Sequence, residues 1–477
     1  MTRPARARLA AATLGALAAA LSPLAAAAAE SEAGGLDGRT LSPLWAVPFA
    51  GILLSIALGP VLAPRLWHHH YGKVALAWGA ATALALLAHA GLGPAFDILL
   101  HTLVLEYVPF VLLLLALFTV TGGLRVEGPF GGTPASNTAL LAAGTALASL
   151  AGTTGAAMLM IRPLVRANAW RRRRAHAVVF FIFLVANVGG ALTPLGDPPL
   201  FLGYLKGVPF FWPTVHLFLP TLLCSTVLLI VFFLVDSWYL RGESRPEGVM
   251  LARLRLEGRA NLPLLAAILC AVLASGMWTG GTALAFHGLA LTWAELLRDG
   301  ALLAVVLVSW IVTPAPTREA SEFGWGPMVE VAKLFAAIFV TIVPVIAMLR
   351  AEQEGPFAPV VALVTRPDGG PADPMYFWAT GLLSSFLDNA PTYLVFFNLA
   401  GGDPAQLTAS LPRTLAAVSA GAVFMGANTY IGNAPNFMVR AIAEEMGLRM
   451  PSFFGYMLWS GAVLLPLFAL VTLLFFR

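Results

Sequence analysis

Residues 190–202 read GALTPLGDPPLFL, and residues 426–438 read GANTYIGNAPNFM. Six of the thirteen positions are identical, and Asp197 of the first block is matched by Asn433 of the second. Both blocks lie within apolar stretches long enough to cross roughly 30 Å of hydrocarbon. Glycine and proline break a helix there, and the freed backbone groups cannot face lipid. The two blocks therefore predict two broken membrane helices that line a buried site.

A single offset relates the two blocks, 426 minus 190, which is 236 residues. The same offset pairs GTTG at 152–155 with DNAP at 388–391, which interrupt two further apolar stretches. It also carries the apolar stretch 215–235 onto 451–471, where the last predicted span lies. One register holds along the whole region, so the chain contains an internal repeat.

The composition is that of a membrane protein. Of the 477 residues, 59% are hydrophobic and 11% are charged, whereas soluble domains carry about 25% charge. The net charge of +4 reflects loop arginines and does not indicate nucleic-acid binding. Full membrane spans are predicted at 43–63, 74–92, 98–121, 178–204, 215–235, 262–278, 301–313, 331–349, 415–440 and 453–476.

The N-terminus has the pattern of a secretory signal peptide. Arg3, Arg6 and Arg8 precede an Ala/Leu run that ends in alanines before Glu30. This order predicts a signal peptide at 1–29 with cleavage near Ala29. The mature chain would then be a multi-pass protein of the bacterial inner membrane.

The interrupted stretches at 139–161 and 377–397 are predicted to be re-entrant hairpins. If the first were a full crossing, Arg171 to Arg174 would lie in the periplasm, against the positive-inside bias. Five predicted crossings separate the hairpins, an odd number, so the second repeat would be inverted. The predicted fold class is an all-α polytopic membrane protein with inverted-topology repeats, each with a re-entrant hairpin and a broken transmembrane helix.

Two acidic residues lie inside the interruptions, Asp197 and Asp388. An ionisable group at membrane depth is costly and indicates a functional site. A buried carboxyl group can alternate between a proton and Na⁺, so both are candidate ion- and proton-binding residues and candidate ligands of Na⁺. The alternative is that each caps the half-helix that follows it.

Neutral oxygen donors in the same interruptions are further candidates, and the alternative is that they satisfy broken backbone. Asn187 is matched by Val423 in the second repeat, which favours an ion site present in one half only. The predicted ion-binding residues besides the aspartates are Asn187, Asn389 and Asn433. The predicted substrate-binding residues are Thr193, Thr429, Asn428, Thr153, Thr154 and Thr392.

Two other polar features are Glu106 and the three histidines at 68–70. Glu106 lies within a predicted span, and its counterpart in the register is Ile342, so it is either a proton carrier or a packing residue. His68, His69 and His70 are predicted to lie in a cytoplasmic loop, where three adjacent histidines with no acidic neighbour do not favour a metal site.

The interrupted motifs resemble the ion transporter superfamily, specifically the bacterial NhaD-like sodium:proton antiporters and citrate transporters. The resemblance implies a mobile transport domain, a scaffold that forms a homodimer, and elevator-type alternating access. After the signal peptide at 1–29, we therefore expect scaffold helices at 43–121 and 213–350, transport-domain segments at 137–204 and 373–440, and a C-terminal helix at 452–477. The motifs are NVGG at 187–190, LGDPP at 195–199, FLDNAPT at 386–392, GANT at 426–429 and GNAP at 432–435.

The hairpin tips depart from the Ser-Asn-Thr signature of carboxylate transporters in that superfamily. They read GTT and DNA, so Asn389 alone matches the central asparagine. The sequence therefore favours sodium:proton antiport, with no cofactor beyond Na⁺ or H⁺, and small ions and the lipid bilayer as partners. The alternative is Na⁺- or H⁺-coupled transport of citrate or another carboxylate.

Two readings from other classes are less well supported, and we expect no enzymatic activity. Two intramembrane aspartates resemble the site of an intramembrane aspartyl protease, but Asn433 replaces the acid in the second block. A passive channel is the other alternative, and saturable exchange kinetics would exclude it.

Overall fold

The computed structural model describes residues 36–477 except 129, 242, 244–254 and 279. The predicted signal peptide, 1–29, lies outside the described residues. The described chain is mostly helical, and its strands form two separate two-stranded sheets. The predicted class of an all-α polytopic membrane protein is confirmed. Within the described residues, seven helical segments are long and apolar enough to cross a membrane: Pro43–Pro60, Pro64–Ala90, Leu92–Thr121, Ala175–Leu192, Trp212–Leu240, Gly326–Arg350 and Phe453–Phe476.

Consecutive N-terminal helices pack against one another. The prediction that His68 to His70 lie in a loop was wrong. They lie within α3, because that helix begins at Pro64, a residue favoured at the first position of a helix. A π-helical turn, Thr102–Tyr107, separates α4 from α5. The group comprises α2 (Val47–Leu62), α3 (Pro64–Ala90), α4 (Leu92–His101) and α5 (Val108–Thr121), preceded by a 3₁₀ turn, Pro43–Ala46.

The first hairpin and broken helix follow the predicted interruptions. Gly152 separates the two hairpin helices with φ of 77°, a left-handed conformation that glycine adopts without strain. Thr133 caps the first of them by accepting from the backbone N–H of Ser136. The elements are α6 (Pro134–Ala151), α7 (Thr153–Ala167), α8 (Ala175–Leu184), a 3₁₀ turn (Val188–Leu192), α9 (Pro198–Leu205) and α10 (Trp212–Leu240).

A connecting region joins the two repeats. Its α12 begins eight residues before the predicted span 301–313, because Thr292 and Glu295 form a capping box ahead of the apolar run. Strand β1 (Arg125–Glu127) pairs antiparallel with β2, and β3 pairs antiparallel with β4. The elements are β2 (Arg255–Glu257), α11 (Asn261–Met277), β3 (Thr282–Phe286), β4 (Leu289–Thr292), α12 (Trp293–Val312), α13 (Ala315–Ala320), α14 (Gly326–Arg350), a 3₁₀ turn (Glu352–Glu354) and α15 (Ala358–Leu363).

The second hairpin and broken helix repeat the pattern of the first. Hairpin helices α16 and α17 meet at Asp388, and the second break falls between α19 and α20. The elements are α16 (Asp373–Phe386), α17 (Asn389–Leu399), α18 (Pro404–Ala409), α19 (Pro412–Met425), a 3₁₀ turn (Gly426–Asn428), α20 (Ala434–Glu445), α21 (Phe453–Val471) and a π-helical turn (Thr472–Phe476).

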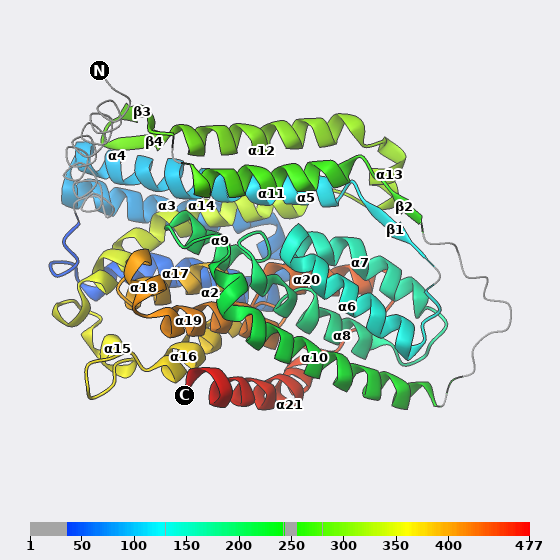
Figure 1. Ribbon diagram of the computed structural model, residues 1–477. Coiled ribbons are helices and arrows are strands. Elements are labelled where there is room, and N and C mark those ends of the chain that lie inside the picture. The colour runs from blue at the N-terminus through cyan, green and yellow to red at the C-terminus, as the bar shows by residue number, and fades with distance from the viewer. Residues whose placement is uncertain (1–35, 129, 242, 244–254, 279) are drawn as a thin grey trace, which may run out of the picture.

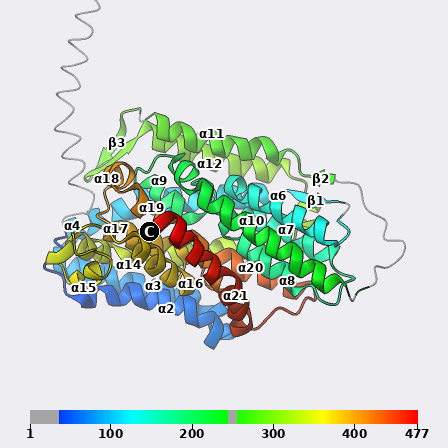
Figure 2. The same cartoon turned by 60° about the horizontal axis from the view of Figure 1, so that its bottom comes forward.

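The hairpins and broken helices occupy the middle of the molecule. Figure 1 shows α7, α9, α17 and α20 between α11 and α12 on one side and α21 on the other, and Figure 2 keeps α11 and α12 at the edge. In the segment Ala175–Leu192, 89% of the residues are buried, against 17% in an apolar 18-residue part of Pro64–Ala90. The interrupted segments are therefore enclosed by protein, as unpaired backbone at membrane depth requires.

The same contacts recur in the two repeats, 236 residues apart. The Thr193 hydroxyl donates to the Ser149 carbonyl, and the Thr429 hydroxyl donates to the Ser385 carbonyl. The Ser149 hydroxyl donates to the Gly189 carbonyl, and the Ser385 hydroxyl to the Met425 carbonyl. The register read from the sequence thus pairs residues with the same structural role. The opposite membrane orientation of the two repeats stays a prediction.

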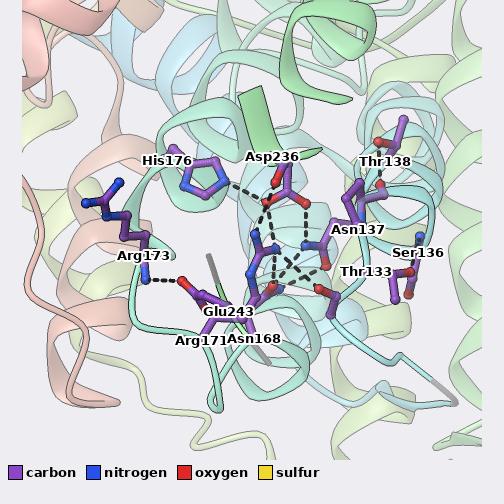
Figure 3. Close-up of polar contacts among 12 residues, drawn as sticks. Thr133, Ser136, Asn137, Thr138, Asn168, Arg171, Arg173, His176, Asp236 and Glu243 are labelled. Atoms are coloured by element: carbon purple, nitrogen blue, oxygen red, sulfur yellow. Dashed lines mark hydrogen bonds and ion pairs between the residues drawn. The ribbon is translucent and has the colours of Figure 1, made fainter. Parts of the chain in front are cut away.

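A buried polar network holds the open end of the first hairpin against α10 (Figure 3). The Asp236 carboxylate pairs with the Arg171 guanidinium at 2.6 Å and with His176 Nε2 at 2.7 Å. Asn137 Nδ2 donates to the second carboxylate oxygen of Asp236 at 3.0 Å and to Asn168 Oδ1 at 2.8 Å. All five side chains are buried. The network ties both ends of the hairpin to α8 and α10, so the hairpin tip has a fixed base.

Candidate functional site

The Asp197 carboxylate lies where the four interruptions of the two repeats meet. It is 1% exposed and accepts hydrogen bonds from three side chains. Thr153 Oγ1 donates at 2.9 Å and Asn433 Nδ2 at 3.3 Å, and Asn389 Nδ2 donates to the other carboxylate oxygen. Each of these residues begins or precedes a half-helix, respectively α7, α20, α17 and, for Asp197 itself, α9. Four helix N-termini, which carry partial positive charge, therefore converge here.

The two predicted aspartates have different environments. The Asp197 side chain makes no capping hydrogen bond to α9. Asp388 caps α17, because its carboxylate accepts from the backbone N–H of Ala390 at 3.1 Å. Asp388 is only half-buried, and its neighbour Asn389 makes the contact with Asp197. Asp388 therefore acts as a helix cap in this structure, whereas Asp197 does not.

A chain of buried amides supports the carboxylate from the side of α20. Asn433 Nδ2 also donates to Asn187 Oδ1 at 3.2 Å. Asn187 Nδ2 donates to Asn436 Oδ1 at 2.7 Å, and Asn436 Nδ2 donates to the Gly426 carbonyl at 2.8 Å. Asn436 was not predicted. A signal was present, since the offset of 236 matches this asparagine with Leu200.

Two buried amide oxygens in the second repeat have no hydrogen-bond partner within the described chain, Asn389 Oδ1 and Asn428 Oδ1. Asn389 is fully buried, and its Nδ2 is already bonded to Asp197. A buried acceptor without a donor costs free energy, about 1–3 kcal/mol. A bound cation would satisfy such an oxygen, because hard cations take amide and carboxylate oxygens as ligands.

The predicted threonines divide into two groups. Thr193, Thr429 and Thr392 each donate to a backbone carbonyl, so they satisfy or hold broken backbone. Thr153 binds Asp197, and Thr154 lines the adjacent cavity.

A cavity of about 90 Å³ adjoins Asp197. Its walls come from α5, the first hairpin tip, α9, the start of α14 and the start of α20. Asp197 is the one charged residue that lines it, and no lysine, arginine or histidine is among its described lining residues. Thr153 and Thr154 supply hydroxyl groups, while the remaining lining is apolar side chains and backbone. The cavity therefore offers a negative charge and neutral oxygens.

A family described as "Putative citrate transport" matches residues 38–476. The chain belongs to this family. The family is part of the ion transporter superfamily, so the resemblance drawn from the interrupted motifs is confirmed at that level. No curated protein matches the chain.

Membership of this family, together with the apolar helices, makes the chain a multi-pass membrane protein and a secondary transporter. In this family member, the described residues contain no group of three or more His, Cys, Asp or Glu side chains that could hold a metal ion. The potential ligands at the site, the Asp197 carboxylate, Asn389 Oδ1 and Thr153 Oγ1, are all oxygens, which suit a hard cation.

Glu106 has a partner that sequence reasoning missed. Lys206 Nζ lies 2.7 Å from Glu106 Oε1. Lys206 is the C-cap of α9, and Glu106 lies in the π-helical turn before α5. The pair connects the half-helix that begins at Asp197 to the N-terminal helices of this transporter.

Proposed function

We propose that the protein exchanges sodium ions for protons, with the Asp197 carboxylate as the group that binds them in turn. The observation that carries this proposal is that Asp197 alone supplies charge to the cavity, where side chains from both repeats converge on it. A carboxylate at membrane depth is costly, so its presence indicates a role in ion or proton transfer.

The chain supplies ligands suited to each state of the carboxylate. With Na⁺ bound, Asp197 and the unpaired Asn389 Oδ1 would both be ligands, and Thr153 Oγ1 lies close enough to contribute. With a proton bound, the carboxyl group is neutral and still accepts from the surrounding amides. Because one site holds either Na⁺ or H⁺, binding of one displaces the other.

The second candidate is ion-coupled transport of a carboxylate, which the family description favours. Four half-helix N-termini at one place could hold an organic anion through their N–H groups. Against it, the described cavity lining contains no basic side chain, and Asp197 would repel a carboxylate. We therefore place cation exchange first.

Alternating access is proposed to occur by movement of the hairpins and broken helices relative to the remaining helices. This proposal includes inverted repeats, a homodimeric scaffold and residence in the bacterial inner membrane. Its support is the enclosed position of the interrupted segments and the recurrence of contacts 236 residues apart.

Proteoliposomes provide the test. An imposed Na⁺ gradient should move protons without any organic anion in wild type, as reported by an enclosed pH-sensitive dye. Asp197→Asn should reduce this exchange by about 100-fold, since one charged group carries both ions. Uptake of labelled citrate is measured in the same vesicles. Strict dependence of ion movement on citrate, or full exchange by Asp197→Asn, would reject sodium:proton antiport at this site.

A further inference from the structure

The ion pair between Glu106 and Lys206 is largely enclosed. The side chains are 14% and 13% exposed, respectively, and the two charged atoms are 2.7 Å apart. Removing both charges from water is costly, and a buried ion pair is often no more stabilising than apolar residues of similar size. The pair therefore requires an explanation other than stability.

The second repeat does without these charges. The offset of 236 matches Glu106 with Ile342 and Lys206 with Ile442. Both isoleucines are buried. The same fold is thus built with an apolar residue at each position, and the two charges occur together in the first repeat. This joint difference favours a specific role for the pair.

The two residues belong to different helical segments that each border the cavity. Lys206 is the C-cap of α9, which begins next to Asp197, and the backbone N–H of Lys206 donates to the Leu202 carbonyl at 3.1 Å. Asp197 and Lys206 are therefore the two caps of one short helix. Glu106 precedes α5, which lines the cavity through residues including Leu113 and Leu117.

The Glu106 side of the pair is fixed to neighbouring helices. The hydroxyl of the adjacent residue, Tyr107, donates to the Ala332 carbonyl of α14 at 2.9 Å. The backbone around Glu106 is π-helical, a rare conformation that is frequent at functional sites. Helices α5 and α14 also line the cavity, and they belong to neither the hairpins nor the broken helices.

We propose that the Glu106–Lys206 ion pair is a conformational latch that holds α9 against the helix containing Glu106 in the state seen here. The latch opens when α9 moves to present Asp197 to the other side of the membrane. Separated charges must be rehydrated or paired again, so the pair favours two discrete arrangements over intermediate ones. This inference rests on the alternating access included in the proposed function.

Reversible cross-linking tests the latch. Glu106→Cys/Lys206→Cys is made in a Cys270→Ser background, because Cys270 is exposed and Cys224 is buried. Oxidation, or Hg²⁺ where the sulfur atoms are too far apart for a disulfide, should reduce exchange at least tenfold, and reductant should restore it. Undiminished exchange after complete cross-linking would overturn the latch. Cysteine is shorter than glutamate and lysine, so where neither reagent cross-links the pair, the Glu106→Ile/Lys206→Ile labelling described below decides the latch.

A matched control uses an ion pair that does not join α9 to another helix. Arg125 and Glu257 are directly paired across β1 and β2, with 3.4 Å between Arg125 Nη1 and Glu257 Oε2. Arg125→Cys/Glu257→Cys should cross-link as readily and leave exchange within twofold of the uncross-linked protein.

A second readout does not depend on the transported ion. Met438→Cys places a thiol in the cavity lining, and a membrane-impermeant thiol reagent reports its accessibility from each side. Replacing the pair by Glu106→Ile/Lys206→Ile should raise labelling from the less accessible side at least threefold, while the cross-link should suppress it. Unchanged labelling in both would overturn the latch. Labelling that responds in a protein without Na⁺/H⁺ exchange would reject the proposed function and retain the latch.

Discussion

Asn389 Nδ2 donates a hydrogen bond to Asp197 Oδ2, although 192 residues separate them in the chain. The contact joins the tip of the second hairpin to the break in the first repeat. Thr153, from the first hairpin tip, binds the other oxygen of the same carboxylate at 2.9 Å. Neither repeat alone could form this site, so movements that separate the hairpin tips would alter ion binding directly.

Asn389→Ala should weaken Na⁺ binding. It removes both the amide donor to Asp197 and the unpaired oxygen that we propose as a cation ligand. The Na⁺ concentration for half-maximal exchange should rise by about tenfold, equivalent to about 1.4 kcal/mol. Asn398→Ala is the matched control, because Asn398 is a buried asparagine in the same helix that binds Arg350 and the Leu394 carbonyl. Equal Na⁺ dependence in Asn389→Ala and wild type would contradict the ligand assignment.

Two substitutions show whether Asp388 is only a helix cap or also an ion-binding carboxylate. Asn is as good an N-cap as Asp, whereas Ala lacks a capping oxygen and costs about 1 kcal/mol. If Asp388 acts only as the cap of α17, Asp388→Asn should retain exchange and thermal stability, and Asp388→Ala should lower the melting temperature. The hydrogen bond from the Ala390 N–H to the Asp388 carboxylate favours this result. Loss of exchange in Asp388→Asn with unchanged stability would instead make Asp388 a second ion-carrying carboxylate.

Asn436→Leu should disturb the site without touching Asp197. The substitution places the residue of the first repeat, Leu200, at the matching position of the second. Asn187 Nδ2 would lose one of its two acceptors and keep the Ile182 carbonyl, and the Gly426 carbonyl would lose a donor. Unpaired buried groups should destabilise the protein by about 1–3 kcal/mol, measured by thermal unfolding in detergent.

Measuring exchange by Asn436→Leu shows whether Asn436 holds the ion site in place or only stabilises the fold. Leu200→Met is the control, since it alters the matching position with little change in volume. Exchange by Asn436→Leu should fall at temperatures where the protein remains folded. Wild-type exchange and stability would show that the amide chain does not hold the site.

Asp236→Ala should be strongly destabilising. The carboxylate is fully buried and pairs with Arg171, His176 and Asn137. Its removal leaves a buried guanidinium without its counter-charge, at a cost of about 3–5 kcal/mol. Thermal unfolding in detergent measures the loss. Glu243→Gln is the control, because Glu243 accepts from the backbone of Arg172 and Arg173 at the edge of the network (Figure 3). A loss no larger than that of the control would contradict the structural role of the network.

The interrupted motifs alone predicted much of the architecture. Glycine and proline within apolar stretches show where membrane helices break, because their effect on backbone conformation and hydrogen bonding is local. The offset of 236 then matched Thr193 with Thr429, and their equivalent contacts bear out that register. The limits of α3 and α12 were less accurate, since polar first turns hide the start of a membrane helix from hydropathy.

The sequence by itself determined that Asp197 lies at a break in a buried membrane helix and that asparagines and threonines accompany it. Only the tertiary structure decided which of them reach it. Asn389 contacts the carboxylate while its neighbour Asp388 caps a helix, because adjacent residues at a half-helix start point in different directions. The pairing of Glu106 with Lys206 likewise depends on how separate helices pack. Such contacts join residues far apart in the chain, so no local pattern reveals them.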